Sequence, residues 1–392
     1  MKYCLENSIE ARSQDILSNF TPAEEYIIYG TGECFLFMQW VFGDLLKIKF
    51  CIDQKACSGS YKIDGHSVYA PQELSKYKNS KIIIAANGEY YVEIKKNLLE
   101  LGHKEKMICS AFEIASVWSM EYKQIIVSMY VSFPILSACT LNCEGCIHYT
   151  SYHKKGFLLK KEDVRKSIDL YFKCIDLVDQ IQIFGGEPFL HKDIGEICQY
   201  ISKRYKDRYH KILVTTNGTI IPDTKVVECL KKCSNLAVSI SDYSQTNEER
   251  LKIDQLIRVC KENEIDYIVN SNFFRSDAQN LWFDCGNPFQ KKEEVDVRNR
   301  FSDCTLSGFG MFKNRYFYCP NSMFANITDI YPEGKDWLDF EHMSQLTRQE
   351  RDWKLRAWHL GFIEDGKLDF CSYCAGFGKK VNSNYIKAGV QL

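Results

Sequence analysis

Several features that would place the chain in common functional classes are missing from its sequence. Lysine and arginine number 50 and aspartate and glutamate 51, so the net charge is −1, whereas nucleic-acid binders usually carry a clear basic excess. No apolar run reaches the roughly 18 residues that a membrane span needs, and residues 1–7 hold no apolar signal-peptide core. We therefore expect no nucleic-acid partner, no membrane span and a cytoplasmic location.

Cysteine, in contrast, is abundant, with 18 residues in a chain of 392. In a long chain without a secretory signal, so many cysteines favour metal binding over disulfides. The content of 45% hydrophobic and 26% charged residues is ordinary for a soluble globular protein. The length allows two or three domains, each with its own core.

The most informative motif is the C-x3-C-x2-C run formed by Cys139, Cys143 and Cys146. Three thiolates in one short loop favour a soft metal. Three is one fewer than closes a structural zinc site or an ordinary Cys4 iron–sulfur cluster. The motif alone is compatible with a [4Fe-4S] cluster that has one open iron, with a zinc knuckle, or with three unrelated buried thiols.

The residues around this motif predict an α/β fold with parallel strands. Apolar strands are expected at 125–133, 180–184, 212–216, 236–241 and 265–270, and helices at 161–174, 223–232 and 246–263. The cysteine motif directly follows the first strand, and Gly185-Gly186-Glu187-Pro188 follows the second. Parallel α/β barrels place their chemistry at these carboxyl ends of strands.

This combination of a C-x3-C-x2-C loop and a Gly-Gly-Glu-Pro turn one helix later resembles the radical S-adenosylmethionine (SAM) superfamily. The resemblance covers residues 125–392 and implies a partial (β/α)6 barrel with a [4Fe-4S] cluster on the three cysteines, whose open iron chelates SAM. It also implies that Glu187 offers a carboxylate near the SAM ammonium and that Tyr149 stacks on the adenine. The SAM-binding residues implied are Gly185, Gly186, Glu187, Pro188, Thr216, Asn217, Ser239, Ser241 and Tyr149.

The chemistry implied by this resemblance is that of a radical SAM oxidoreductase. A reduced cluster cleaves SAM to methionine and a 5′-deoxyadenosyl radical, which takes hydrogen from an unactivated C–H bond. An external donor such as flavodoxin or ferredoxin would supply the electron. The sequence identifies no catalytic base or hydrogen donor.

A second cysteine set lies in the last part of the chain. Cys304 and Cys319 flank a predicted hairpin that turns at Lys313-Asn314, and Cys371 and Cys374 form a C-x2-C pair. A Cys4 zinc ribbon fits the same residues, and Cys285 competes as a further ligand. The pattern resembles the twitch subdomain, a shortened SPASM domain, which implies a second, fully ligated [4Fe-4S] cluster. In SPASM hairpins a glycine often stands where this chain has Asn314, a residue that tolerates positive φ.

The first part of the chain alternates strands at 26–29, 47–52 and 81–86 with helices at 34–46 and 91–101. Gly30 and Gly32 follow the first strand and Asp53 ends the second, as in half of a nucleotide-binding Rossmann sheet. Phe35 occupies the place of the third glycine in the G-x-G-x-x-G motif. The segment resembles small Rossmann domains of polysaccharide-pathway transferases, which implies a nucleotide or nucleotide-sugar ligand. A scaffold without a ligand is the alternative.

These observations predict a Rossmann-like domain over 1–118, a radical SAM barrel over 119–285 and a twitch-like domain over 286–392. We expect a carbohydrate-biosynthesis enzyme that oxidises or epimerises a sugar, cyclitol or nucleotide-linked sugar. A peptide-modifying radical SAM maturase is the alternative. A non-catalytic zinc-binding protein is a third hypothesis, and it leaves the Gly-Gly-Glu-Pro turn unexplained.

Overall fold

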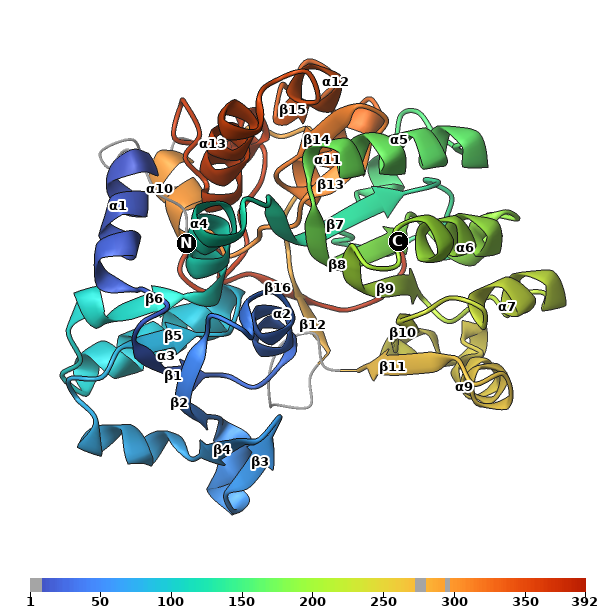
Figure 1. Cartoon of the computed structure of the whole chain (residues 1–392). Helices are drawn as coiled ribbons and strands as arrows, with labels where there is room; N and C mark the ends of the chain where they lie inside the picture. The colour runs from blue at the N-terminus through green and yellow to red at the C-terminus, as the bar shows by residue number, and fades with distance from the viewer. Residues whose placement is uncertain (1–8, 272–279, 293–296) are drawn as a thin grey trace. The chain divides into compact units, whose positions relative to one another are not determined.

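The computed structural model describes residues 9–271, 280–292 and 297–392, and these form two compact units. The first unit comprises Met1–Met129 with Asp352–Phe362, and the second comprises Tyr130–Arg351 with Ile363–Leu392 (Figure 1). The predicted boundary at 285/286 falls inside the second unit, so the three-domain division stays a prediction.

The first unit is built on a six-stranded sheet of order β3-β4-β2-β1-β5-β6. All its neighbouring strands are parallel except the edge pair β3–β4. The strands are β1 Glu25–Tyr29, β2 Lys47–Ile52, β3 Tyr61–Ile63, β4 His66–Tyr69, β5 Ile82–Ile84 and β6 Ile108–Ser110. The helices are α1 Ile9–Asn19, α2 Glu33–Phe42, α3 Gly88–Glu100 and α4 Ala111–Lys123, with short 3-10 turns η1 Gln54–Ser58, η2 Pro71–Lys76 and η3 Glu105–Met107.

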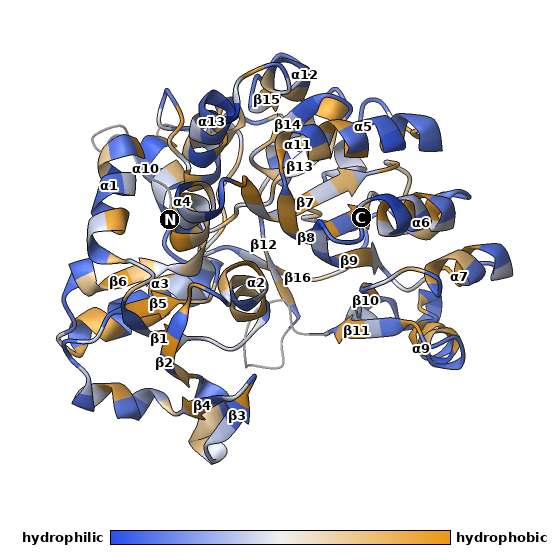
Figure 2. Ribbon diagram, viewed as in Figure 1, coloured by the Kyte–Doolittle hydropathy of each residue, from blue (hydrophilic) through white to orange (hydrophobic). Residues whose placement is uncertain are grey.

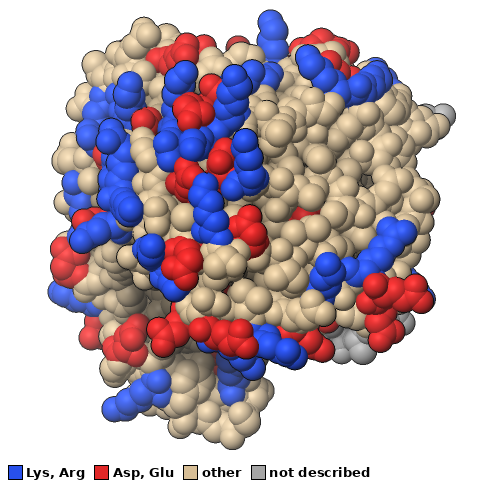
Figure 3. Space-filling model, turned by 90° about the vertical axis from the view of Figure 1, so that its right-hand side faces the viewer, with Lys and Arg blue, Asp and Glu red and all other residues tan. Residues whose placement is uncertain are grey.

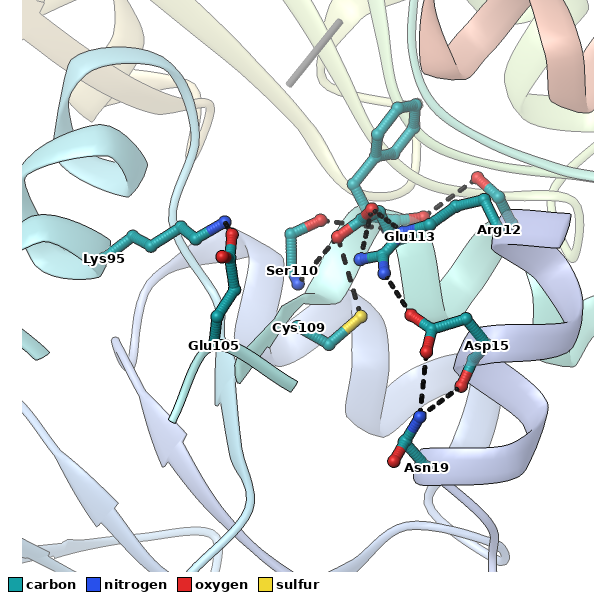
Figure 4. A network of polar contacts seen from close by, with 10 residues as sticks. Arg12, Asp15, Asn19, Lys95, Glu105, Cys109, Ser110 and Glu113 are labelled. Carbon is teal, nitrogen blue, oxygen red and sulfur yellow. Dashed lines mark hydrogen bonds and ion pairs between the residues drawn. The ribbon is translucent and has the colours of Figure 1, made fainter. Parts of the chain in front are cut away.

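An ion pair between a partly buried arginine and a buried glutamate joins α1 to α4 in this unit (Figure 4). Arg12 donates to Glu113, whose side chain is 1% exposed, over 2.9 Å. The second carboxylate oxygen of Glu113 accepts hydrogen bonds from the backbone N–H of Ser110 (3.2 Å) and from the thiol of Cys109 (3.6 Å). Ser110 and Glu113 also form a capping box that starts α4. Because each carboxylate oxygen has a partner, removing one member of this network alone would leave buried polar groups unpaired and destabilise the unit.

The second unit is built on an eight-stranded sheet of order β11-β10-β9-β8-β7-β13-β14-β15. Successive strands from β8 to β11 are parallel, and β13 lies parallel to β7. The strands are β7 Val127–Pro134, β8 Leu177–Phe184, β9 Tyr209–Thr216, β10 Leu236–Ser241, β11 Asp266–Asn270, β13 Gly310–Phe312, β14 Arg315–Phe317 and β15 Trp337–Asp339. The predicted α/β fold class is confirmed, and the place beside β7 is taken by a strand from the C-terminal cysteine region.

The helices of this unit connect the parallel strands and extend past them. They are α5 Lys161–Cys174, α6 Ile194–Arg204, α7 Thr224–Leu230, α8 Ser244–Asn247, α9 Ile253–Glu262, α10 Val297–Asp303, α11 Pro320–Ile327, α12 Phe340–Met343 and the shared α13 Arg348–Leu360. The 3-10 turns are η4 Thr150–Tyr152, η5 Pro188–Leu190, η6 Glu248–Arg250 and η7 Asp369–Ser372, and β12 Leu281–Phe283 pairs antiparallel with β16 Tyr385–Lys387. Figure 2 shows hydrophobic residues concentrated in β7 and β8, whereas α5 is mostly hydrophilic.

Two local predictions are wrong. The single helix predicted over 246–263 is divided into α8, η6 and α9, because Lys252 leaves the helical path and its N–H donates to the carbonyl of Gly218. The β13–β14 turn does not use Asn314 for the positive φ. Lys313 adopts it instead, at 57°, while the Asn314 amide donates to the carboxylate of Asp339 on β15 (3.2 Å).

Charges of both signs are interspersed on the face of the molecule drawn in Figure 3. In the second unit Glu196 on α6 pairs with Lys161 on α5 (2.6 Å) and with Lys225 on α7 (2.7 Å). These two lysines lower the pKa of Glu196 to about 2. Among the described residues, no helix is long and apolar enough to cross a membrane.

Candidate active site

The three cysteines of the C-x3-C-x2-C motif lie in the loop that follows β7, which we call the cysteine loop (residues 135–149). Each sulfur has one side-chain hydrogen-bonding partner. The pairs are Cys139 with Asn217 Nδ2 (3.5 Å), Cys143 with Gln391 Nε2 (3.3 Å) and Cys146 with Thr150 Oγ1 (3.5 Å). The sequence predicted the thiols but neither Gln391 nor Thr150 as their partners.

The thiols lie close enough to influence one another. Burial, with the neighbouring Cys146 adding to it, raises the pKa of Cys139 to about 11 and that of Cys143 to about 12. No three His, Cys, Asp or Glu side chains in the described parts of the chain are arranged to hold a single metal ion. Three mutually close thiols, of which Cys143 is buried and the other two are partly buried, fit the soft ligand set of an iron–sulfur cluster. Binding such a group would release the thiol protons.

The glycines of the Gly-Gly-Glu-Pro turn let the end of β8 approach the cysteine loop. A Cβ on Gly185 would lie 2.2 Å from the carbonyl oxygen of Leu136, and one on Gly186 would lie 2.1 Å from that of Ala138. The two segments are joined by backbone hydrogen bonds, from Gly186 to Leu136 (3.0 Å) and from Glu187 to Ala138 (2.8 Å). The motif therefore fixes the cysteine loop against the sheet.

Glu187 is fully buried and accepts three hydrogen bonds from the protein. One oxygen receives the hydroxyl of Thr216 (2.8 Å) and the N–H of Phe189 (3.1 Å), and the other receives the N–H of Asn217 (2.8 Å). Burial raises the pKa of Glu187 to about 7, although these hydrogen bonds act in the opposite direction. The carboxylate thus ties the end of β8 to the end of β9, and the contact predicted with the SAM ammonium stays a prediction.

Asn217 continues this network into the cysteine loop. Its Oδ1 accepts from the N–H and the hydroxyl of Thr219 (3.0 and 2.6 Å), and its Nδ2 donates to Thr140 (3.0 Å) as well as to the Cys139 sulfur. The hydroxyls of Thr140 and Thr219 are 2.5 Å apart. Since Oδ1 faces donors, the amide nitrogen must face the sulfur. The structure therefore joins Glu187, Thr216 and Asn217 to Cys139, and the predicted contacts of these residues with SAM stay predictions.

Comparison with known proteins agrees with this geometry. Residues 133–268 match the family model described as the radical SAM superfamily. The chain carries a radical SAM domain. Residues 23–109 match a second family model, described as C2185-like, N-terminal, which lies within the first unit.

Curated relatives of the radical SAM domain are named for different activities. The chain is 29% identical over 126 residues to the antilisterial bacteriocin subtilosin biosynthesis protein AlbA of Bacillus subtilis, covering 32% of this chain and 25% of AlbA. It is 28% identical over 116 residues to the S-adenosylmethionine-dependent nucleotide dehydratase of Selenomonas ruminantium, covering 29% and 39%. It is 23% identical over 260 residues to the GTP 3′,8-cyclase of Clostridium acetobutylicum, covering 62% and 76%. The chain thus spans a quarter of AlbA's length and about two fifths of the dehydratase's.

Parts of this chain also align with solved structures. BtrN in complex with AdoMet and 2-DOIA aligns with 67% of this chain and 100% of its own, at 12% identity and a TM-score of 0.41. Streptococcus suis SuiB bound to the precursor peptide SuiA aligns with 48% and 46%, at 19% identity and a TM-score of 0.32.

The other predicted SAM contacts of the radical SAM domain stay predictions. Ser239 and Ser241 are buried on β10; Ser239 accepts a hydrogen bond from Asn270 (2.9 Å), and Ser241 is hydrogen-bonded to Tyr243. Pro188 begins η5. No described contact joins these serines to the cluster cysteines.

Tyr149 lies among the residues of the C-terminal cysteine set. It is 2% exposed and packs in one apolar cluster with Cys285 and Phe370, whose ring is 5.7 Å away. Its hydroxyl accepts from Asn321 (3.2 Å). Adenine stacking by Tyr149 remains a prediction, while its observed contacts connect the cysteine loop to the second cysteine set.

That second set is organised around Cys374. Its sulfur accepts hydrogen bonds from the N–H of Gly376 (3.3 Å) and from Asn321 (3.7 Å). Arg300 holds the C-x2-C segment by donating to the carbonyls of Cys371 (3.1 Å) and Cys374 (2.9 Å). Cys319 stands at the N-terminus of α11, and Cys304 follows α10.

Cys285 is part of this set. It is 1% exposed, and its thiol forms a hydrogen bond with Cys374 that lowers the pKa of Cys374 and raises that of Cys285. Cys304 also contributes to the raised pKa of Cys285. From the sequence Asp-Cys-Gly-Asn-Pro around it, Cys285 was predicted only as a ligand that competes with the other four cysteines.

In the first unit, the predicted nucleotide-binding residues form the turn after β1. Gly30 has a φ of 107°, and a Cβ there would lie 2.6 Å from the carbonyl oxygen of Ala85. Asp53 accepts from the N–H and hydroxyl of Thr31 (3.1 and 2.7 Å) and from the N–H of Lys55 (2.9 Å). Gly32 precedes α2 with open space beside it. The carboxylate of Asp53 thus braces the turn, and nucleotide binding stays a prediction.

Proposed function

We propose that the chain is a radical SAM oxidoreductase that removes hydrogen from a sugar, cyclitol or nucleotide-linked sugar and so oxidises or epimerises it. The observation that carries the proposal is the set of three adjacent thiols, each with its own hydrogen-bonding partner, tied by Asn217 to the Gly-Gly-Glu-Pro turn. A [4Fe-4S] cluster on Cys139, Cys143 and Cys146 would supply the electron that converts SAM to methionine and a 5′-deoxyadenosyl radical. The protein would hold these partners and exclude water.

The oxidation balances as the loss of two electrons and two protons from the substrate. A carbinol C–H bond of the substrate would give its hydrogen atom to the 5′-deoxyadenosyl radical, which would leave as 5′-deoxyadenosine. The substrate radical then loses its hydroxyl proton and one electron, which leaves a carbonyl. Cys304, Cys319, Cys371 and Cys374 would hold a second [4Fe-4S] cluster, and that cluster would accept the electron. An external flavodoxin or ferredoxin would provide the electron that starts the reaction.

Support for a sugar-type substrate comes from the first unit and from the relatives. A Rossmann-like sheet with a glycine turn suits a nucleotide-linked ligand, and two of the relatives are named for reactions of nucleotides. A peptide substrate is the second candidate, because AlbA is named as a bacteriocin biosynthesis protein.

The decisive experiment is anaerobic. The iron-loaded chain is mixed with SAM and a strong reductant, and 5′-deoxyadenosine is quantified with nucleotide sugars, cyclitols, nucleotides or short peptides added in parallel. We expect nucleotide sugars or cyclitols to stimulate release. Stimulation by peptides alone would favour the second candidate, and no release from iron-loaded protein would contradict radical SAM chemistry in this chain.

The proposed second cluster gives a prediction for Cys374. Replacing it in Cys374→Ala should lower the iron content from about eight to about four per chain, since each cluster holds four irons. Cys304, Cys319 and Cys371 are the other proposed ligands. With Cys374 gone, one iron would lack a thiolate, and this site has no SAM to complete its coordination as proposed for the cluster on the cysteine loop. Iron analysis after anaerobic reconstitution, with the ultraviolet–visible spectrum, measures the loss.

Two cysteine variants make this test specific. Cys229→Ala, at a partly exposed position on α7, should keep the full iron content. Cys285→Ala should also keep it, because we assign Cys285 as a hydrogen-bonding partner of Cys374. Equal loss in Cys285→Ala would make Cys285 a ligand, and wild-type protein with only about four irons would refute the second cluster.

A further inference from the structure

A segment distant in sequence lies along the cysteine loop. The N–H of Glu144 donates to the carbonyl of Val390 (2.7 Å), and the N–H of Leu392 donates to the carbonyl of Asn142 (2.9 Å). These two hydrogen bonds flank Cys143, which forms an antiparallel bridge with Gln391. Residues 388–392, which we call the strap, are therefore paired with the loop at one of the proposed cluster ligands.

The strap is fixed on its other side by α8. Thr246 donates to the carbonyl of Ala388 (2.8 Å), and the buried Asn247 donates to that of Gly389 (2.5 Å). Gly389 has a φ of 78°, and a Cβ there would lie 2.8 Å from both Thr246 Oγ1 and Tyr243 Cβ. A larger residue would displace the strap, so glycine is required at this position.

The cysteine loop is shaped to receive this part of the chain. Gly145 lies between Cys143 and Cys146 with a φ of 64°, and a Cβ on it would lie only 1.9 Å from Cδ1 of Ile386 in β16. The cysteine loop therefore lies close to the chain from β16 through the strap. The tight packing at Gly145 and the hydrogen bonds of the strap both fix the strap in one position against the loop.

The seated strap gives the Gln391 amide a single orientation. Its Oε1 accepts from the N–H of Asn142 (2.7 Å) and from the guanidinium of Arg250 (3.4 Å). Its Nε2 donates to the carbonyl of Gly389 (2.7 Å) and to the sulfur of Cys143 (3.3 Å). A flipped amide would place its NH2 group against two donors. The N–H therefore points at the sulfur, and Arg250 lies at the far end of the same amide.

We propose that Gln391 is a positioning residue that donates a hydrogen bond to the Cys143 ligand and raises the reduction potential of the SAM-binding cluster. The inference rests on the proposed function. A hydrogen bond to a ligand sulfur favours the reduced cluster, because that state carries more negative charge on its sulfurs. The positive charge of Arg250, acting through the Gln391 amide, strengthens the effect.

The test is a redox titration of the full-length, iron-loaded protein, followed by electron paramagnetic resonance. The SAM-binding cluster is identified as the signal that changes when SAM is added. We expect Gln391→Leu to make its reduction about tenfold less favourable, which is a fall of about 59 mV for a one-electron couple. Gln391→Glu keeps the side-chain size but places an oxygen at the sulfur, and it should lower the potential at least as far. Gln349→Leu makes the same change at an exposed position on α13 and should leave the potential unchanged.

Each outcome decides between a redox role and a purely structural one. A SAM-responsive signal at the wild-type potential in both Gln391 variants would overturn the proposal. If a variant fails to retain iron, thermal unfolding of the iron-free chain is compared with wild type. If the variant loses iron but its iron-free chain unfolds at the wild-type temperature, the result supports a role at the cluster. If the iron-free variant is also less stable than wild type, the result overturns the proposal. If the wild-type protein gives no SAM-responsive signal, the proposed function itself fails.

Discussion

Cys143→Ala should reduce 5′-deoxyadenosine release more than 100-fold, beyond the roughly 10- to 100-fold loss typical when only an outer-shell partner of a metal site is removed. Cys143 is the most buried of the three loop cysteines. It is also the residue on which the strap is paired through Gln391. Alanine leaves only two thiols, Cys139 and Cys146, to hold the cluster. It also leaves the Gln391 amide without the sulfur that accepts its hydrogen bond. The measurement is 5′-deoxyadenosine released per chain from SAM and reductant, together with iron content.

The matched control for this variant is Cys57→Ala, the same change at an exposed cysteine of the first unit. It should release 5′-deoxyadenosine at the wild-type rate and keep the wild-type iron content. If Cys143→Ala kept more than a tenth of the wild-type activity, the assignment of Cys143 as a ligand would be wrong. If both variants lost activity equally, the loss would reflect general sensitivity of the chain to cysteine substitution.

The part of the site that the sequence predicted consists of local motifs. The C-x3-C-x2-C loop and the Gly-Gly-Glu-Pro turn are contiguous, and strand periodicity placed each at the end of a strand. The strands at 47–52 and 236–241 and the helix at 161–174 have the predicted bounds, because apolar residues recur within each at a spacing that suits a strand or a helix. Asn217 was named from the family resemblance as a SAM-binding residue, a role that stays a prediction, and its contact with the Cys139 sulfur could not be predicted.

The parts that the sequence could not predict depend on contacts between distant segments. Gln391 is 248 residues from Cys143, and nothing in its own neighbourhood distinguishes it from a surface glutamine. The break before α9 has the same origin, since Lys252 leaves the helix to bond with Gly218. Local propensity also favoured Asn314 over Lys313 for the positive φ, but the Asn314 side chain is engaged by Asp339. In each case a tertiary hydrogen bond overrides the local preference.

Glu187→Ala should lower the free energy of unfolding by about 3 kcal/mol near pH 5, and the deficit should shrink as the pH rises. Alanine leaves the hydroxyl of Thr216 and the N–H groups of Asn217 and Phe189 without their acceptor. An unpaired buried donor costs about 1–3 kcal/mol, and the three share one site, so their costs overlap. The measurement is urea unfolding of the iron-free full-length chain across the pH range 5 to 8.

The pH dependence follows from the buried carboxyl. Burial disfavours the charged form and raises the pKa of Glu187 in the folded protein from the ordinary value of 4.5 to about 7. The folded state therefore binds the proton more tightly, and the contribution of Glu187 to stability is full below pH 4.5 and lost as the pH rises through about 7. This shift corresponds to about 3 kcal/mol. Glu187→Gln cannot ionise, so its stability relative to wild type should rise as the pH rises from 5 to 8, even though its NH2 group must face a donor in either orientation. A Glu187→Ala deficit that stayed constant or grew with pH would show that the three hydrogen bonds outweigh burial and keep the carboxylate charged.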